Sequence, residues 1–289
     1  GIELHFYYSL LDWGRPDYAF GSPIVNGAPV NGDWDSYIKF MKTQLTELIT
    51  NYPAVKGIWF DGHWERTSAN WHYDEIYGLI HKLNPAIMVG NNHHEAVKDG
   101  EDFQMFEKDM PGSNTTGFSG ESKIGKLPLE TCETINNSWG FNITDRSYKS
   151  VKQIIHYLVT DAGMNANFLL NVGPMPNGKI QKEFVDTLAK VGDWMKKNGE
   201  SIYETRGNLI APQQWGVVTS KGNTIYAHVL NTPSDGYILI PSLTKKITKI
   251  IALSNGDPLK FKQQPEGVFV YTKGLATDPY DTVIKITTN

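Results

Sequence analysis

Short apolar runs and amphipathic segments alternate along the first two thirds of the chain. Each apolar run is bounded by Gly, Pro or polar residues, which is typical of a buried strand. The amphipathic segments carry apolar residues at helical spacing. Predicted strands are 2–8, 55–60, 86–89, 103–106, 130–135 and 166–172, and predicted helices run from Asp33 or Asp35 to 50, then 70–83, 148–163 and 180–199. This alternation predicts an α/β fold with parallel strands covered by helices.

The pattern changes near Arg206. From there to Asn289 apolar and polar residues alternate in short segments, separated by turns such as KGNT and SNGDP. Such segments predict an antiparallel β domain, most simply a small sandwich. We therefore expect two domains, a (β/α) domain at 1–205 and a β-sandwich at 206–289.

Composition excludes some classes of protein and leaves others open. A net charge of −4 gives no reason to expect nucleic acid or an anionic membrane as a partner. The single cysteine, Cys132, permits neither an internal disulfide nor a Cys-based zinc site. The 8 Trp and 14 Tyr residues are compatible with carbohydrate stacking, but filling a core is the more ordinary use of such residues. The chain opens inside a predicted strand and without Met, so we expect further residues upstream.

The stretch GIWFDGHW at 57–64 carries the first candidate for chemistry. It ends a predicted strand, and the carboxyl ends of parallel strands are where α/β enzymes place their active sites. Asp61 stands there between Trp59 and Trp64. Asp-Gly is also a common turn pair, so a plain turn is the alternative. A carboxylate held among rings suits a nucleophile or an electrostatic stabiliser.

A second carboxylate is needed if the site cleaves a glycosidic bond, because such enzymes use two acids in different environments. The segment EDFQMFEKD at 101–109 offers Glu107, with a solvated charged loop as the alternative reading. Glu121 and Glu130 are rival acids that the sequence does not exclude.

Two adjacent histidines, His93 and His94, follow the third predicted strand in GNNHH. Neighbouring side chains on an extended segment point to opposite sides, so the pair is poorly placed to ligate one metal ion. We expect no metal and no cofactor. Hydrogen bonding to a polyhydroxylated ligand suits them better, with structural packing an alternative for one of the two.

Several long motifs together resemble glycoside hydrolase family 29, the α-L-fucosidases. They are HFYYSLLDWGRPDY, GIWFDG, GNNHH, EDFQMFEKDMPG, LPLETCETINNSWGFN and NANFLLNVGPMPNGKI. The resemblance covers about residues 2–205 and implies a TIM-like (β/α) barrel followed by a β-sandwich. It is nearest to the subgroup that prefers α-1,3/1,4-linked fucose in branched glycans, and it implies a periplasmic or secreted location.

The resemblance also implies residue roles. Asp61 corresponds to the nucleophile and Glu107 to the acid/base of a retaining double displacement. Tyr8 would bind a sugar hydroxyl or the nucleophile, and His93 or His94 would bind the sugar. Trp59 and Trp139 would form a pocket wall against the C5 methyl group of fucose, which disfavours sugars with a hydroxyl there.

One departure from the family pattern concerns the barrel. Family members carry roughly three barrel strands, with a tryptophan and several histidines, before the YYS segment. We therefore expect a barrel that is incomplete at its amino-terminal side, and possibly a homo-oligomer that covers the open edge. A truncated, inactive relative that at most binds glycan is the main alternative. A retaining glycosidase with another specificity, such as one for galactosides, is a third.

Overall fold

The computed structural model describes residues 1–18, 32–116 and 123–289. It divides into two compact units, Gly1–Leu129 and Glu130–Asn289. Each unit has a hydrophobic core of its own: one gathers residues between Leu10 and Val89, and two others gather residues after 150.

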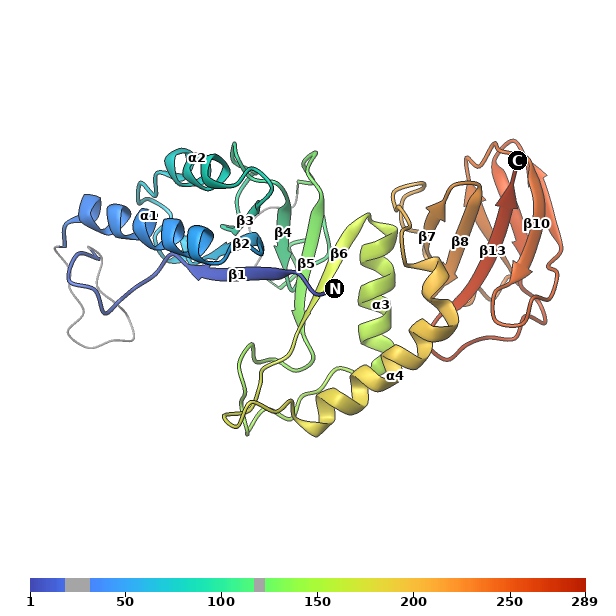
Figure 1. Ribbon diagram of the computed structural model, residues 1–289. Coiled ribbons are helices and arrows are strands. Elements are labelled where there is room, and N and C mark those ends of the chain that lie inside the picture. The colour runs from blue at the N-terminus through green and yellow to red at the C-terminus, as the bar shows by residue number, and fades with distance from the viewer. Residues whose placement is uncertain (19–31, 117–122) are drawn as a thin grey trace. The chain divides into compact units, whose positions relative to one another are not determined.

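The first unit is built around a parallel three-stranded sheet (Figure 1). Its strands and helices follow one another as β1 (Leu4–Ser9), α1 (Trp34–Asn51), β2 (Val55–Asp61), the short 3-10 helix η1 (His63–Glu65), α2 (Tyr73–Leu83) and β3 (Met88–Asn92). Both strand pairs, β1 with β2 and β2 with β3, are parallel, and β2 is central. A fourth strand, β4 (Gln104–Glu107), lies beside β3.

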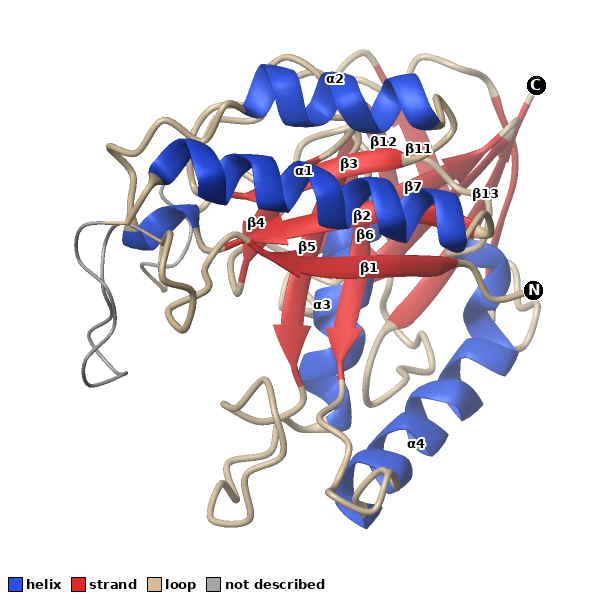
Figure 2. Cartoon of the chain, turned by 60° about the vertical axis from the view of Figure 1, so that its left-hand side comes forward, coloured by secondary structure: helices blue, strands red, loops and turns tan. Residues whose placement is uncertain are grey.

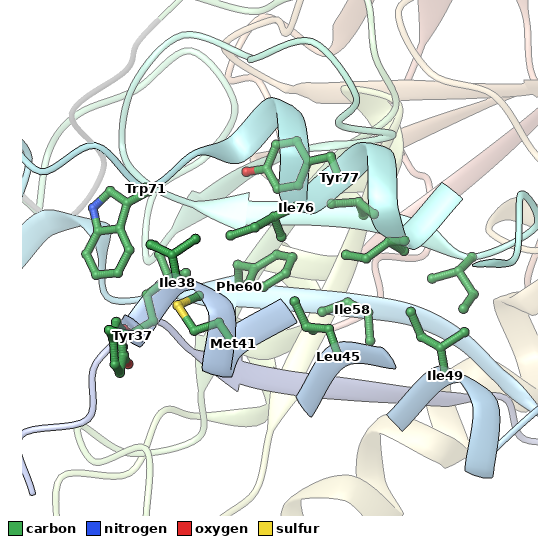
Figure 3. Packing of buried hydrophobic residues seen from close by; sticks show 14 of the residues in the cluster. Tyr37, Ile38, Met41, Leu45, Ile49, Ile58, Phe60, Trp71, Ile76 and Tyr77 are labelled. Carbon is green, nitrogen blue, oxygen red and sulfur yellow. Dashed lines mark hydrogen bonds between the residues drawn. The ribbon is translucent and has the colours of Figure 1, made fainter. Parts of the chain in front are cut away.

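Helices α1 and α2 lie over the same face of this sheet (Figure 2). Met41 and Leu45 of α1 and Ile76 of α2 pack against Ile58 and Phe60 of β2 (Figure 3). Side chains alternate between the two faces of a strand. Burial of Ile58 and Phe60 under the helices therefore directs the residues between and after them, Trp59 and Asp61, to the opposite face.

The second unit begins with two strands and two helices and ends with antiparallel strands. The first elements are β5 (Leu129–Thr134), α3 (Val151–Gly163), β6 (Ala166–Asn171), α4 (Lys182–Asn198) and the 3-10 helix η2 (Gly199–Ser201). Ser150 and Gln153 form a capping box that fixes the start of α3. Strands β5 and β6 are neighbours in one sheet.

Seven further strands form the predicted sandwich. They are β7 (Gly216–Lys221), β8 (Thr224–Val229), β9 (Tyr237–Pro241), β10 (Ile247–Ala252), β11 (Phe261–Gln264), β12 (Gly267–Tyr271) and β13 (Thr282–Thr288). One sheet has the order β10-β13-β8-β7 and the other β11-β12-β9, both antiparallel. Residues of both sheets meet in a single apolar core, for example Ile284 with Val268.

All ten predicted strands and helices before residue 200 are present, within a few residues of their expected ends. The predicted boundary at 205/206 does not coincide with the division between the compact units, which falls after Leu129. The reason is a shared core: Ile155 and Trp194 of α3 and α4 are buried with Val217, Tyr226 and Val283 of the sandwich strands. Residue 206 therefore marks a change of secondary structure inside the second unit.

Candidate active site

Polar side chains gather on the face of the β1–β2–β3 sheet that the helices leave uncovered. Tyr7 is in register with Trp59, and the strand ends place Asp61 in register with Asn92. Since these strands are parallel, their carboxyl ends all lie at the same end of the sheet. Asp61, Asn92 and the rings of Tyr7 and Trp59 are thus close neighbours by register alone.

Both carboxylate oxygens of Asp61 accept hydrogen bonds. The Tyr7 hydroxyl donates to Oδ2 at 2.6 Å, while Trp64 Nε1 and Asn92 Nδ2 each lie 3.3 Å from Oδ1. Gly62 follows with φ 108°, and a side chain there would meet Leu11 at 2.7 Å. Glycine is therefore required at the turn that follows Asp61. The carboxylate is partly buried and held in one orientation.

Tyr7 and Trp59 form an aromatic wall beside this carboxylate. Their rings stack with centroids 5.6 Å apart and an angle of 23° between planes. Although 62% of Tyr7 is exposed, its hydroxyl is held by the hydrogen bond to Asp61. Burial, together with the hydrogen bond to Asp61 and the nearby charge of Glu107, raises the pKa of Tyr7 well above its ordinary value. The phenol therefore stays protonated and acts as a donor to Asp61.

Glu107, at the end of β4, shares a hydrogen-bond donor with Asp61. Asn92 Nδ2 donates to Glu107 Oε2 at 2.6 Å and reaches Asp61 Oδ1 at 3.3 Å. These two oxygens are thus at most about 6 Å apart, the sum of the two distances, which is within reach of the roughly 5–5.5 Å typical of retaining glycosidases. Glu107 and Asn92 are both buried. The structure therefore brings the two predicted catalytic carboxylates together.

The two adjacent histidines point to different surroundings, although their backbone is not extended as expected: β3 ends at Asn92 and His94 has φ 59°. His94 lies with Nε2 3.7 Å from Glu107 Oε2, on the site side. Burial lowers the pKa of His94, and the charge of Asp61 opposes this effect. His93 instead uses both ring nitrogens locally: Nδ1 accepts from the Glu95 amide and Nε2 contacts Glu101 at 2.8 Å. Both ring nitrogens of His93 are therefore engaged within the protein, which fits the structural alternative for one of the pair, and substrate binding by His93 or His94 stays a prediction.

Tyr8 also differs from the expectation. Its hydroxyl donates to Gln44 of α1 at 2.7 Å, and its ring packs edge-on against Phe60. It lies on the helix-covered face because it is one residue out of step with Tyr7. Tyr7, which the sequence argument passed over, makes the contact with Asp61 that had been assigned to Tyr8.

Glu101, which opens the segment that carries Glu107, has a structural place. It is buried and accepts from His93, Tyr77 and the Lys98 amide, so it organises the loop after β3. Trp139 and Glu130 belong to the second unit, where Asn171 donates to the Trp139 carbonyl at 2.7 Å. Glu121 lies outside the described residues. Trp139 in the pocket wall, and Glu121 or Glu130 as rival acids, stay predictions.

Two kinds of feature are absent from the described ranges, 1–18, 32–116 and 123–289. No three His, Cys, Asp or Glu side chains there group as ligands for a metal ion. No helix within those ranges has the length and apolar character needed to cross a bilayer.

A parallel α/β sheet that brings two carboxylates together at its strand ends is typical of a glycoside hydrolase. Comparison with known sequences narrows this class. The sequence model of the α-L-fucosidase family matches residues 1–200, and the chain belongs to that family. Human tissue α-L-fucosidase is 29% identical over 294 residues, covering 93% of this chain and 57% of the human protein. The α-L-fucosidase of Dictyostelium discoideum is 26% identical over 248 residues, covering 83% of this chain and 51% of that protein.

Solved structures agree with this family assignment. α-L-Fucosidase isoenzyme 1 from Paenibacillus thiaminolyticus superposes with a TM-score of 0.81 at 31% identity, covering 100% of this chain and 72% of that one. An α-L-fucosidase from Bacteroides thetaiotaomicron has the same TM-score at 22% identity, with 100% and 68% covered. The present chain spans little more than half the length of the curated relatives it matches.

Proposed function

We propose that this chain is a retaining exo-α-L-fucosidase that releases terminal α-linked L-fucose from oligosaccharides or glycoconjugates. The observation that carries the proposal is the shared donor Asn92, which keeps Asp61 and Glu107 within about 6 Å of each other. That separation leaves room for one anomeric centre between the two carboxyls, whereas an inverting enzyme needs space for an additional water molecule.

In the first step, an Asp61 oxygen attacks the anomeric carbon while Glu107 gives its proton to the leaving glycosidic oxygen. A new carbon–oxygen bond forms an ester with Asp61, and the bond to the leaving sugar breaks. In the second step, Glu107 removes a proton from water, the water oxygen attacks the same carbon, and Asp61 leaves as a carboxylate. Tyr7 and Trp64 would stabilise that carboxylate, because both donate toward it.

A fucosidase of the same fold supports a covalent route. The Bacteroides thetaiotaomicron enzyme has been solved as a trapped covalent intermediate with 2-fluoro-fucosyl fluoride. Specificity for α-1,3/1,4-linked fucose in branched glycans is part of our proposal and follows from the motif resemblance described above. Trp59 would face the C5 methyl group of the bound sugar.

The decisive test combines an aryl α-L-fucoside with azide. Asp61→Ala should abolish hydrolysis, and azide should restore turnover and yield the β-fucosyl azide, because azide then replaces the missing nucleophile. Glu107→Ala with an activated leaving group should instead yield the α-fucosyl azide, because azide attacks the intermediate on Asp61. Proton NMR should show α-L-fucose as the first product of the parent protein.

These products also separate the alternatives. If Glu121→Ala or Glu130→Ala, rather than Glu107→Ala, gave the α-azide, the acid/base assignment would be wrong. Turnover of neither the aryl fucoside nor a fucosylated trisaccharide would favour the inactive, glycan-binding relative. Faster turnover of the matching aryl galactoside would favour the third reading.

The proposal extends to the barrel: if this chain stands alone, the barrel is incomplete at its amino-terminal side and a second copy covers the open edge. Within the described residues β1 pairs only with β2, so it is the edge of its sheet, and it leaves Leu4 and Tyr7 exposed. Light scattering should therefore give a dimer or larger assembly. A monomer at all concentrations would contradict this part of the proposal.

A further inference from the structure

The indole of Trp64 reaches the proposed nucleophile from an exposed position. Its Nε1 lies 3.3 Å from Asp61 Oδ1, although 53% of Trp64 is exposed. Trp64 is the middle residue of η1, a single turn of 3-10 helix that begins after Gly62. Such a short turn makes few hydrogen bonds of its own, and an exposed side chain gains rotamer freedom when it leaves a partner. The direction of the indole N–H toward Asp61 therefore depends on how η1 itself is anchored.

Glu65 anchors η1 on one side. Only 7% of its side chain is exposed, and both carboxylate oxygens contact Trp13 Nε1, Oε2 at 2.9 Å and Oε1 at 3.2 Å. Trp13 belongs to the segment that follows β1 and packs against the core of the first unit. Arg66 Nη2 adds an ion pair to Oε1 at 3.1 Å. Hydrogen bonds to a buried carboxylate are strong because one partner carries a charge, so Glu65 fixes this end of η1.

His63 anchors η1 on the other side of Trp64. It is 3% exposed, and its Nδ1 lies 2.8 Å from the Tyr73 hydroxyl while its Nε2 lies 3.1 Å from Glu95 Oε1. Tyr73 opens α2, and Glu95 belongs to the segment that follows β3. The two residues that flank Trp64 are thus both buried and bonded to neighbouring segments, and Trp64 itself is exposed between them.

We propose that Glu65 and Trp13 are positioning residues for the nucleophile. By fixing η1, they direct the Trp64 N–H at Asp61. This inference deepens the proposed fucosidase function and rests on it, because the donor matters for turnover only if Asp61 is the nucleophile. A donor that is fixed before the reaction stabilises the negative charge of Asp61 when this carboxylate leaves the sugar, whereas a donor that is free to turn away contributes less.

A double-mutant cycle with an aryl α-L-fucoside tests this coupling. Trp64→Phe removes the donor and should lower kcat/KM roughly five- to tenfold. Trp13→Phe keeps an aromatic ring but removes the N–H that Glu65 accepts, and it should lower kcat/KM roughly three- to tenfold. Trp13→Phe/Trp64→Phe should stay within about two-fold of Trp64→Phe, because Trp13 acts through Trp64. Losses that multiply in the double variant would overturn the proposal.

The indole NMR signal of Trp64 supplies a readout that a general loss of stability does not move. It is identified as the nitrogen–proton signal that is absent from Trp64→Phe. In Asp61→Ala the signal should move, because the indole loses its acceptor. In Trp13→Phe it should move in the same direction, since the N–H is no longer held on Asp61. A Trp64 signal that keeps its parent position in Trp13→Phe overturns the proposal.

Glu65→Gln and Glu65→Leu form a matched pair. A glutamine oxygen in the place of Oε1 can accept from both Trp13 and Arg66, whereas leucine offers no acceptor. Glu65→Gln should therefore keep kcat/KM within about three-fold of the parent and leave the Trp64 signal close to its parent position. Glu65→Leu should resemble Trp13→Phe in both measurements. Equal behaviour of the two variants contradicts the positioning role.

Trp215 supplies a control in the second unit. Its Nε1 donates to the Leu239 carbonyl at 3.1 Å, so Trp215→Phe removes an indole donor of the same kind far along the chain from Asp61. This variant should leave both kcat/KM and the Trp64 signal unchanged, and an equal movement of the signal there overturns the proposal.

The NMR measurement also separates this proposal from the fucosidase proposal, because it needs no turnover. If the parent hydrolyses no fucoside but the Trp64 signal moves in Trp13→Phe as expected, the fucosidase proposal fails and the positioning of Trp64 stands. If the parent is active and the signal does not move in Trp13→Phe, only the positioning role fails.

Discussion

Asn92 offers the sharpest test of the carboxylate pair, because one amide group touches both acids. In the variant Asn92→Ala, Glu107 loses its 2.6 Å hydrogen bond and Asp61 loses a weaker one at 3.3 Å. A hydrogen bond to a charged acceptor contributes about 1.5–3 kcal/mol, and the short distance places the Glu107 contact in the upper part of that range. The 3.3 Å contact adds little.

This loss converts to a rate. A barrier raised by about 2–3 kcal/mol lowers kcat roughly 30- to 150-fold. The pH–rate profile should also move to higher pH, because Glu107 loses a donor that favours its ionised form. Asn92→Asp should move the profile further, since it adds a third negative charge at nearly constant volume. The assay is hydrolysis of an aryl α-L-fucoside from pH 4 to pH 9, with thermal unfolding measured in parallel.

The neighbouring asparagine supplies a matched control. Asn91 is equally buried but lies on the helix-covered face, where it donates to the Tyr77 hydroxyl at 2.9 Å. Asn91→Ala should lower stability by about 1 kcal/mol and leave the pH–rate profile in place. If Asn92→Ala reduced kcat less than three-fold without moving the profile, or if Asn91→Ala moved it equally, the role given to Asn92 would be refuted.

Three further predictions use other parts of the molecule. Tyr7→Phe should lower kcat/KM roughly tenfold by removing the 2.6 Å hydrogen bond to Asp61, whereas Tyr8→Phe should leave activity unchanged. Equal effects would contradict the placement of Tyr7 and Tyr8 on opposite faces of the sheet. Gly62→Ala should lower the free energy of unfolding by about 1–3 kcal/mol, whereas Gly178→Ala, at φ 79° with nothing near, should cost less; thermal unfolding compares them. Burial raises the pKa of Asp161 from 3.8 to about 8, so the folded chain keeps a proton that the unfolded chain loses, and stability should fall by roughly 4 kcal/mol between pH 4 and pH 7. Asp161→Asn should flatten that dependence in urea unfolding, and an unchanged slope would contradict it.

The sequence predicted the strands and helices well because their signals are local. Apolar runs such as the one ending at Asp61 are short and continuous, and α1 has both an N-cap at Asp33 and an apolar stripe. The strand β11 (Phe261–Gln264) carries no such signal, because it is mostly exposed and polar. The division after Leu129 has no local signal in the sequence, because it depends on packing between elements distant in the sequence.

The candidate site was predicted in part for a similar reason. Asp61 and Glu107 were found because they follow apolar strands, and position at a strand end is visible in the sequence. Choosing Tyr8 over Tyr7 required knowing which face of β1 the helices cover. Alternation along β2 shows which of its residues share a face with Asp61. Which residues of β1 lie on that face depends on the register between β1 and β2, and this register is set by the tertiary structure. Asn92 was missed for the same reason.

Register also explains how the site is maintained. Tyr7, Asp61, Asn92 and Glu107 come from four successive strands, β1 to β4, and each contributes one polar group to a single cluster. A shift of one residue in β2 would turn Asp61 toward the helices and bring Phe60 into the site. That shift is opposed by the fully buried Phe60 and Ile58, which contribute about 1.5–3 kcal/mol each by burial. The apolar contacts under α1 and α2 therefore determine the face on which the carboxylates meet. A core substitution such as Phe60→Ala should displace the carboxylates, although Phe60 itself lies on the opposite face of the sheet.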